Sequence, residues 1–333
     1  MQKQSRIYVA GHRGLVGSSI CRGLEGSGYS QILARTRAEL DLFDGAAVNT
    51  FFREEKPEYV VLAAAKVGGI YANDAYPADF IRDNLLIQNN VIDACYRFGV
   101  KRLLFLGSSC IYPKFAPQPI PEESLLTGSL EPTNRAYALA KIAGIEMCWS
   151  YNRQYGTSFL AAMPSNLYGP GDNFDLETSH VLPALMRKLV EARGEGRREV
   201  TVWGTGAPRR EFLYSDDLAD ACIFLLNLPD SVYQSMLNRE QPPLINIGTG
   251  EDLTIQDLAE LISKIVGFEG ELVFDPTRPD GTPRKVLDVR RIDALGWRAK
   301  TSLEDGIRLT YQSYKSKSKT EQPDRLSEIQ RVL

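Results

Sequence analysis

Three glycines at intervals of three residues follow the first apolar run of the chain, and they constrain its fold more than any other feature. The run Arg6–Ala10 has the length of a buried strand, and Ser18–Gly26 after the glycines has apolar residues at helical spacing. Glycines there let the backbone approach a pyrophosphate, and the helix N-terminus offers free N–H groups to phosphates. A tight loop without a ligand would also use glycines, but the position between strand and helix favours a dinucleotide site. The expected contacts in this turn are Gly11, Arg13, Gly14, Leu15, Val16 and Gly17.

Strands and helices alternate along the first half of the chain. Further apolar runs with the length of buried strands are Gln31–Ala34, Tyr59–Ala64, Arg102–Leu106 and Phe159–Met163. Stretches with helical periodicity between them are Ala46–Glu55, Asp79–Phe98 and Ala136–Tyr155. Such alternation predicts a parallel sheet with helices on both faces. The predicted fold class is therefore α/β, with a Rossmann-type doubly wound parallel sheet.

The composition of the chain changes near residue 166, and its pattern of strands and helices becomes less regular. Beyond it, strings rich in glycine, proline and polar residues, such as YGPGDNF and RPDGTPRK, separate short helices and strands. We expect a nucleotide-binding domain over 1–166, to which about 211–250 returns, and a smaller C-terminal α/β substrate-binding region over 167–315. The last residues, 316–333, form a charged tail without a motif.

Composition excludes several classes of protein. The 333 residues carry a formal charge of −3, so neither nucleic acid nor a membrane surface is expected as a partner. The five cysteines include no CxxC pair and only two histidines are present, so no metal site is expected. The N-terminus lacks a signal-peptide core and no apolar run is long enough to span a bilayer, so we expect a cytoplasmic protein.

Arginines at the end of the second predicted strand bear on the choice of cofactor. An NAD site usually places a carboxylate there, whereas the 2′-phosphate of NADP favours arginine. The strand runs into the string ARTR (34–37) with no acidic residue before Glu39, and Arg13 lies in the glycine turn. Guanidinium groups bind phosphate in bidentate fashion, so Arg13 and Arg37 predict NADP, although a solvated basic strand end would have the same sequence. Leu42 is expected beside the adenine.

A serine and a YxxxK pair form a candidate catalytic group. Ser108 follows the fourth predicted strand, and Tyr137 and Lys141 lie one turn apart on one face of the next long helix. A nearby ammonium favours the tyrosinate, so we expect Lys141 to lower the pKa of Tyr137 toward a range useful for proton transfer. Ser108 is then placed to hold a substrate oxygen. Tyr–Lys pairs are common on helix surfaces, but here the glycine turn and the serine accompany the pair.

Together these features resemble the extended short-chain dehydrogenase/reductase superfamily. Longer strings resemble one family within it, the GDP-L-fucose synthases. They are AGHRGLVGS, LAAAKVGGI, FLGSSCIYPK, EPTNRAYALAKIAG, NLYGPGDNF, SHVLPAL, REFLYSDDLA and FDPTRPDGTPRK, and they extend from residue 10 to residue 285. The resemblance implies NADPH-dependent epimerisation at carbons 3 and 5 of GDP-4-keto-6-deoxy-D-mannose and reduction at carbon 4 to give GDP-L-fucose.

That reaction needs acid/base groups beyond Ser108, Tyr137 and Lys141. Inverting a carbon next to a ketone requires removal of a proton from one face and delivery to the other. Cys110, two residues past Ser108, and His180, in the string TSHV, are the candidates, and the resemblance implies this role for them. A lone cysteine is more often a small buried hydrophobe, but Cys110 lies in a polar setting. Which of the two is the base and which the acid stays open.

The resemblance also supplies the remaining site residues. Further cofactor contacts are expected from Ala64, Leu106, Gly107, Tyr137, Lys141, Pro164, Asn166, Leu167 and His180. The positions that match substrate contacts of the family are Lys188, Trp203, Arg210 and Asp280. Among them, Arg210 is suited to bind a diphosphate.

Two alternatives and an oligomeric state complete the predictions. Another sugar-nucleotide epimerase or dehydratase of the superfamily would share the cofactor site. A 4-epimerase would show no net use of NADPH. A dehydratase would need carboxylates near Ser108. A non-catalytic NADP sensor would share the fold but would not need the Ser–Tyr–Lys group. The helices Asp79–Phe98 and Ala136–Tyr155 carry more apolar residues than one sheet face covers, so we expect a homodimer paired through them.

Overall fold

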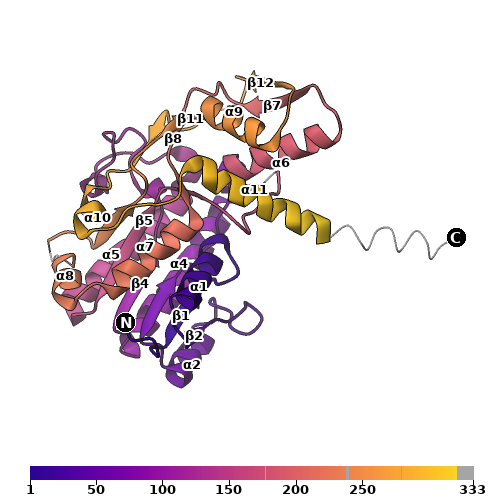
Figure 1. The fold of residues 1–333 in the computed structure, drawn as a ribbon. Coiled ribbons are helices and arrows are strands. Elements are labelled where there is room, and N and C mark those ends of the chain that lie inside the picture. Colours follow the sequence, from indigo (N-terminus) through magenta and orange to yellow (C-terminus); the bar gives the residue numbers. More distant parts are fainter. Residues whose placement is uncertain (177, 238–239, 279, 321–333) are drawn as a thin grey trace.

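A central sheet of six parallel strands lies in the middle of the fold (Figure 1). Its strands have the order β10–β5–β4–β3–β1–β2, and all except β10 come from the first half of the chain. The computed structural model describes residues 1–333 except 177, 238–239, 279 and 321–333. The strands of the sheet are β1 (Ile7–Ala10), β2 (Ile32–Leu33), β3 (Tyr59–Leu62), β4 (Arg102–Leu106), β5 (Phe159–Pro164) and β10 (Leu244–Ile247). The direction in which strands are added reverses between β1 and β3, and ligands of doubly wound sheets bind at such a reversal.

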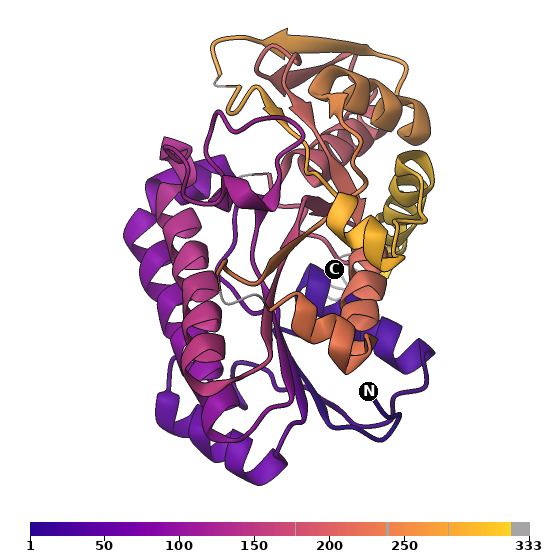
Figure 2. The ribbon, with the colours of Figure 1, turned by 90° about the vertical axis from the view of Figure 1, so that its left-hand side faces the viewer.

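Helices cover both faces of this sheet (Figure 2). One face packs against α2 (Gly45–Glu55), α4 (Pro77–Arg97) and α5 (Arg135–Tyr155), and the other against α1 (Leu15–Gly26) and α7 (Ser215–Asn227). Every residue of β1, β4, β5 and β10 is buried. Burial on both faces explains why these strands appear in the sequence as continuous apolar runs rather than as alternating ones.

Side chains and glycines at the helix ends explain where several helices begin and stop. Asp44 precedes α2 and accepts hydrogen bonds from the N–H groups of Ala46 and Ala47. Thr254 and Asp257 form a capping box at the start of α9 (Ile255–Val266). Gly156 ends α5 at a φ of +69°, a left-handed conformation that favours glycine.

A second, smaller region lies over the carboxyl ends of the strands and has its own hydrophobic core. Its elements are α6 (Val181–Gly194), β7 (Glu199–Trp203), β8 (Arg209–Arg210), β11 (Leu253–Thr254), α9, β12 (Glu271–Asp275), β13 (Arg284–Lys285) and α11 (Leu303–Thr320). β7 pairs with β12, and β8 lies between β11 and β13. Helix α6 packs on α9, and α11 packs on α9 from another side.

The chain passes repeatedly between the central sheet and the second region. It leaves the sheet after β5 through β6 (Asn166–Tyr168), which pairs with β9 (Phe212–Tyr214), and α7 then returns to pack on α1. β10 joins the sheet beside β5, α10 (Arg290–Leu295) packs beneath it, and α11 closes the second region. The remaining short helices are α3 (Ile70–Ala75) and α8 (Asp230–Ser235).

One buried carboxylate connects three of the segments that run between the central sheet and the second region. Glu211, which is fully buried, accepts hydrogen bonds from the backbone N–H groups of Thr249, Gly250 and Leu287 at 2.6, 2.9 and 2.8 Å. Glu211 itself follows β8, Thr249 and Gly250 follow β10, and Leu287 follows β13. The contacts fix the strands of the second region relative to the edge of the sheet.

The predicted α/β fold with a doubly wound parallel sheet is confirmed. The predicted elements occur with small shifts at their ends: α1 begins at Leu15 rather than Ser18, and β2 has two residues where four were predicted. The short helices α3, α8 and α10 were not predicted. In the charged tail, α11 extends to Thr320, and 321–333 lie outside the described residues. Of the helices that the structure describes, none is both long and apolar enough to cross a membrane.

Candidate active site

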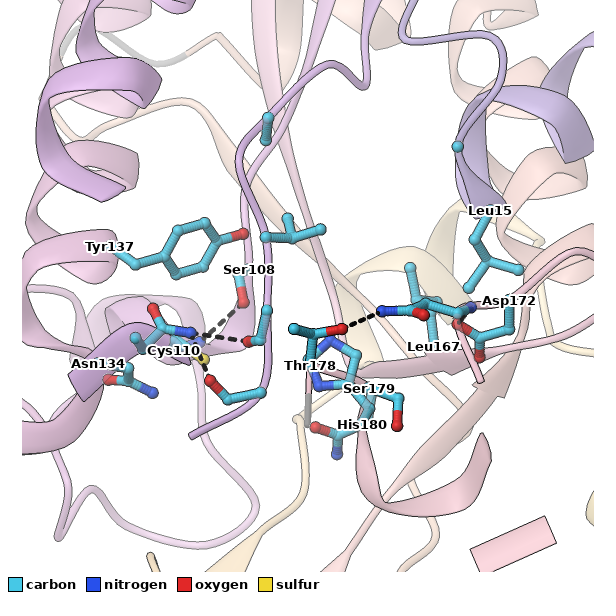
Figure 3. A pocket seen from close by; sticks show the side chains of 18 of the residues that line it. Leu15, Ser108, Cys110, Asn134, Tyr137, Leu167, Asp172, Thr178, Ser179 and His180 are labelled. Carbon is cyan, nitrogen blue, oxygen red and sulfur yellow. Dashed lines mark hydrogen bonds between the residues drawn. The ribbon is translucent and has the colours of Figure 1, made fainter. Parts of the chain in front are cut away.

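A cavity of about 1050 Å³ opens between the carboxyl ends of the central strands and the second region. Its walls come from the glycine turn, the loops after β3 and β4, the N-terminal turns of α5 and α6, and the segments around β8 and β13. Figure 3 shows Ser108, Cys110 and Tyr137 on one wall, and His180 coming from the opposite one. The volume is at the upper end of small-molecule sites, so the cavity has room for a cofactor and a substrate together.

The glycine turn leaves space that any side chain would fill. Gly11 has a φ of +86°, and a Cβ there would lie 2.7 Å from the backbone nitrogen of Ala64. A Cβ at Gly17 would lie 2.1 Å from the carbonyl oxygen of Gly11. Gly14 is the N-cap of α1 and has no side chain to occupy the first N–H groups of the helix. The turn and helix end therefore fit a pyrophosphate.

Arginines gather where the ribose of a dinucleotide would lie. Arg37 lines the cavity with a side chain that is 74% exposed, and its guanidinium lies 3.8 Å from Asp41 and 4.8 Å from the centre of the Phe43 ring. Arg35 lines it too, paired with Glu55. Among the described residues of the cavity wall Arg13 does not occur, so the second cation beside Arg37 is Arg35. The string ARTR contained this arginine, but sequence alone did not show which of its side chains faces inward.

The Ser–Tyr–Lys group is assembled around the end of β4. Ser108 follows this strand and accepts a hydrogen bond from the N–H of Cys110 at 3.3 Å. Lys141 is buried, and its ammonium donates to the carbonyl oxygen of Leu106 at 2.8 Å. The same ammonium lies 5.8 Å from the centre of the Tyr137 ring. The three side chains therefore meet at one corner of the cavity.

Burial dominates the protonation of this group. It raises the pKa of Tyr137, helped by the Cys110 thiol and opposed by a hydrogen bond with Ser108. It also lowers the pKa of Lys141 to about 7. The prediction that Lys141 lowers the pKa of Tyr137 is therefore wrong in this structure, because desolvation disfavours the charged form of each group. A protonated Tyr137 is suited to donate a proton.

Cys110 and His180 reach the cavity from different parts of the fold. Cys110 is partly exposed in the short 3-10 turn Ser109–Ile111. His180 is the N-cap of α6 and opens onto the cavity. Burial lowers the pKa of His180, and the positive charge of Lys285 lowers it further. The segment before His180 is held by a hydrogen bond from the N–H of Gly69 to the carbonyl of Thr178 at 3.0 Å.

The far end of the cavity is cationic and aromatic. Trp203 is 54% exposed, and its ring centre lies 5.2 Å from the Lys188 ammonium and 4.9 Å from the Arg278 guanidinium. Arg210 donates to the carbonyl oxygen of Arg209, and burial lowers its pKa. Asp280 accepts hydrogen bonds from the backbone and hydroxyl of Thr205. A diphosphate and a planar base fit this combination.

Apart from Arg13, the residues predicted for the site all line the cavity. They are Gly11, Gly14, Leu15, Val16, Gly17, Arg37, Leu42, Ala64, Leu106, Gly107, Ser108, Cys110, Tyr137, Lys141, Pro164, Asn166, Leu167, His180, Lys188, Trp203, Arg210 and Asp280. Polar residues that the sequence reasoning missed also line it, and six of them are Arg35, Glu131, Asn134, Asp172, Thr282 and Lys285. Of these six, all except Arg35 and Asp172 lie in the strings EPTN and RPDGTPRK. Over the described part of the chain, no three His, Cys, Asp or Glu side chains form a metal-binding group.

A doubly wound sheet with a glycine turn and a Ser–Tyr–Lys group at its strand ends defines a dinucleotide-dependent enzyme of the extended short-chain dehydrogenase/reductase type. The sequence pattern of the NAD dependent epimerase/dehydratase family matches residues 7–248. The chain therefore belongs to that family.

Individual relatives narrow the comparison. GDP-L-fucose synthase 1 of Arabidopsis thaliana is 59% identical over 312 residues, 94% of each chain. A GDP-L-fucose synthetase of Naegleria fowleri, solved with NADP bound, is 30% identical, with a TM-score of 0.83 over 96% of this chain and 97% of its own. A GDP-D-glycero-L-gluco-heptose synthase of Campylobacter jejuni, solved in the presence of NADPH, is 42% identical, with a TM-score of 0.88 over 95% and 99%. All three carry a GDP-sugar in their names.

Proposed function

We propose that this protein epimerises GDP-4-keto-6-deoxy-D-mannose at carbons 3 and 5 and reduces carbon 4 with NADPH to give GDP-L-fucose. The observation that carries the proposal is the meeting of two sets of groups in one cavity. Ser108, Tyr137 and Lys141 suit ketone reduction, while Cys110 and His180 suit proton exchange beside the ketone. The names of relatives that match nearly the whole chain support the same substrate.

NADPH would lie along the glycine turn, with its 2′-phosphate toward Arg37 and Arg35, and would supply the hydride for carbon 4. Tyr137 donates the proton that the reduced oxygen needs, because burial keeps it protonated at neutral pH. Ser108 holds the same oxygen. Lys141, fixed to the Leu106 carbonyl, stabilises the tyrosinate left after proton transfer.

Epimerisation uses Cys110 and His180, the two acid/base groups that have no part in the reduction. A carbon next to the ketone loses its proton to one side chain, and the electrons of the C–H bond pass into the carbonyl to form an enolate. A second side chain returns a proton from the other face. Cys110 and His180 belong to different walls of the cavity, as two opposed faces require.

The proposal includes a homodimer in the cytoplasm. Helices α4 and α5 lie side by side and keep apolar side chains exposed on their outer surface, namely Leu86, Tyr96, Leu139 and Tyr155. Two copies paired through these helices would cover them. Light scattering after size exclusion measures the mass, and a monomer at micromolar concentration would remove this part of the proposal.

One incubation tests the activity. Purified protein, GDP-4-keto-6-deoxy-D-mannose and NADPH are mixed, the absorbance of NADPH is followed, and the product is identified by chromatography and NMR against GDP-L-fucose. A 4-epimerase would consume no NADPH, and a sensor would bind NADPH without turnover. Consumption with GDP-6-deoxy-D-talose or GDP-rhamnose as the product would mean a reductase without epimerase activity.

A further inference from the structure

Lys285 lies beside Cys110, and the reaction described so far gives it no part. Its ammonium nitrogen is 3.8 Å from the Cys110 sulfur. Both side chains line the main cavity, and both also line a small side cavity of about 20 Å³. The lysine therefore contacts the sulfur at the edge of the site, beside the space left for the sugar.

The backbone that carries Lys285 is fixed on both sides. β13 pairs with β8, and the carbonyl of Lys285 accepts the N–H of Glu211 at 3.3 Å. On the other side the N–H of Val286 donates to Gln118 Oε1 at 3.0 Å, and the N–H of Ile120 donates to the Val286 carbonyl at 2.8 Å. Val286 and Leu287 are 1% exposed. The position of Lys285 is thus set by the fold rather than by its own side chain.

The charge of Lys285 is not neutralised by a carboxylate. Two other lysines of the cavity wall or its margin are paired with carboxylates: Lys66 with Asp79 and Asp83, and Lys114 with Glu131. For Lys285, the described residues offer no carboxylate within ion-pair distance, and its ammonium has the Cys110 sulfur as its hydrogen-bond partner. An unpaired cation next to a sulfur favours the thiolate.

The other groups around Cys110 leave this effect intact. Arg210 on β8 interacts with it as a second positive charge. Tyr137 on α5 stays neutral because its pKa is raised, and the lowered pKa of His180 on α6 favours the neutral imidazole. Glu131 shares the side cavity, but Lys114 at 2.9 Å offsets its charge. The balance of charge at the sulfur is therefore positive.

We propose that Lys285 is a positioning residue for epimerisation, whose ammonium holds the Cys110 sulfur as a thiolate directed into the cavity. The proposal rests on the proposed function, in which Cys110 exchanges protons with the keto sugar. When Cys110 accepts a proton, the C–H bond breaks, an S–H bond forms, and the C–H electrons pass into the carbonyl to give the enolate. Lys285 takes no part in the transfer of the proton.

Alkylation of Cys110 tests the contact without any substrate. Iodoacetamide is added at a fixed neutral pH, and mass spectrometry follows the peptide that contains Cys110. Because the thiolate is the nucleophile, Lys285→Gln should slow alkylation about tenfold, and Lys285→Arg should restore most of the rate. Arg284→Gln is the matched control, since Arg284 pairs with Asp252 instead, and its rate should equal that of the wild type. Lys285→Met serves if the glutamine variant does not fold.

The catalytic arm separates epimerisation from reduction. In heavy water, Lys285→Gln should slow deuterium entry at carbons 3 and 5, but it should reduce a keto sugar that is already epimerised at the wild-type rate. Equal alkylation and equal exchange in wild type and Lys285→Gln would overturn the proposal, and so would an equal slowing in Arg284→Gln. If the wild type shows no exchange, the proposed function fails, while alkylation still decides whether Lys285 activates the sulfur.

Discussion

The two regions contribute to the site in different ways. The central sheet supplies Ser108, Tyr137 and Lys141 from one strand end and one helix, so the groups for reduction share a single rigid support. The groups for epimerisation are divided, because Cys110 belongs to the sheet region and His180 begins α6 in the second. Reduction thus depends on local geometry, whereas epimerisation depends on how the two regions are placed relative to each other.

Tyr137→Phe should have the largest effect, because it should remove most of the reduction and leave epimerisation intact. Removing the proton donor should slow NADPH consumption by about 100- to 10,000-fold, while deuterium from heavy water still enters carbons 3 and 5. Tyr76→Phe, a change at an exposed tyrosine that does not line the described cavity, is the control. Near-normal reduction by the Tyr137 variant would make this tyrosine structural.

Cys110→Ser should have the converse effect. A hydroxyl is a far weaker acid than a thiol, so deuterium exchange should fall by about 100-fold or more, while slow reduction of the unepimerised ketone persists. His180→Ala should behave in the same way if the cross-cavity pair acts together. Mass spectrometry of the recovered sugar nucleotide measures the exchange. Full exchange in both variants and in their combination would place epimerisation elsewhere.

Lys141→Met should remove activity yet stabilise the sheet region. Burial lowers the pKa of Lys141 from 10.5 to about 7, so the unfolded chain binds more protons than the folded one between these values. Stability is therefore lost as pH falls from 10.5 to 7 and stays constant below. Without added nucleotide, the variant should gain about 4 kcal/mol in unfolding free energy at pH 7, and the gain should vanish toward pH 10.5. Denaturant titration measures it, with the exposed Lys264→Met as control; a gain independent of pH would contradict the explanation.

Arg37→Ala should have the smallest effect, because its side chain is mostly exposed. Loss of one charged contact to the 2′-phosphate should reduce the preference for NADPH over NADH about tenfold. Arg13→Ala should change this preference less, since Arg13 does not line the described cavity. Ratios of kcat/KM for the two cofactors decide the matter. A larger effect at Arg13 would reverse the assignment made from the structure.

Sequence reasoning worked best where a periodic pattern had a single physical cause. The buried strands and long helices of the sheet were predicted to within a few residues, because burial on both faces leaves continuous apolar runs. The family prediction was confirmed by relatives that match nearly the whole chain. Two-residue strands such as β8 and β13 have no such periodicity, and their pairing depends on contacts distant in sequence.

The site shows the same limit. The glycine turn and the YxxxK pair are local patterns, so the sequence could place them. Lys285 is separated from Cys110 by 175 residues, and only the folded chain shows that the two meet. The direction of the pKa of Tyr137 was wrong for a related reason, since spacing on a helix reveals the neighbouring lysine but not the burial of both groups.

The repeated passage of the chain between the two regions has a consequence for engineering. No single cut releases the second region, because α7, β10 and α10 interrupt it and Glu211 ties three of the crossings together. The substrate-binding region therefore cannot be replaced as one contiguous segment to make the protein accept another sugar. New specificity has to be introduced by changing side chains and loops in place, around β8, α6 and the turn before β13, while the crossings are left intact.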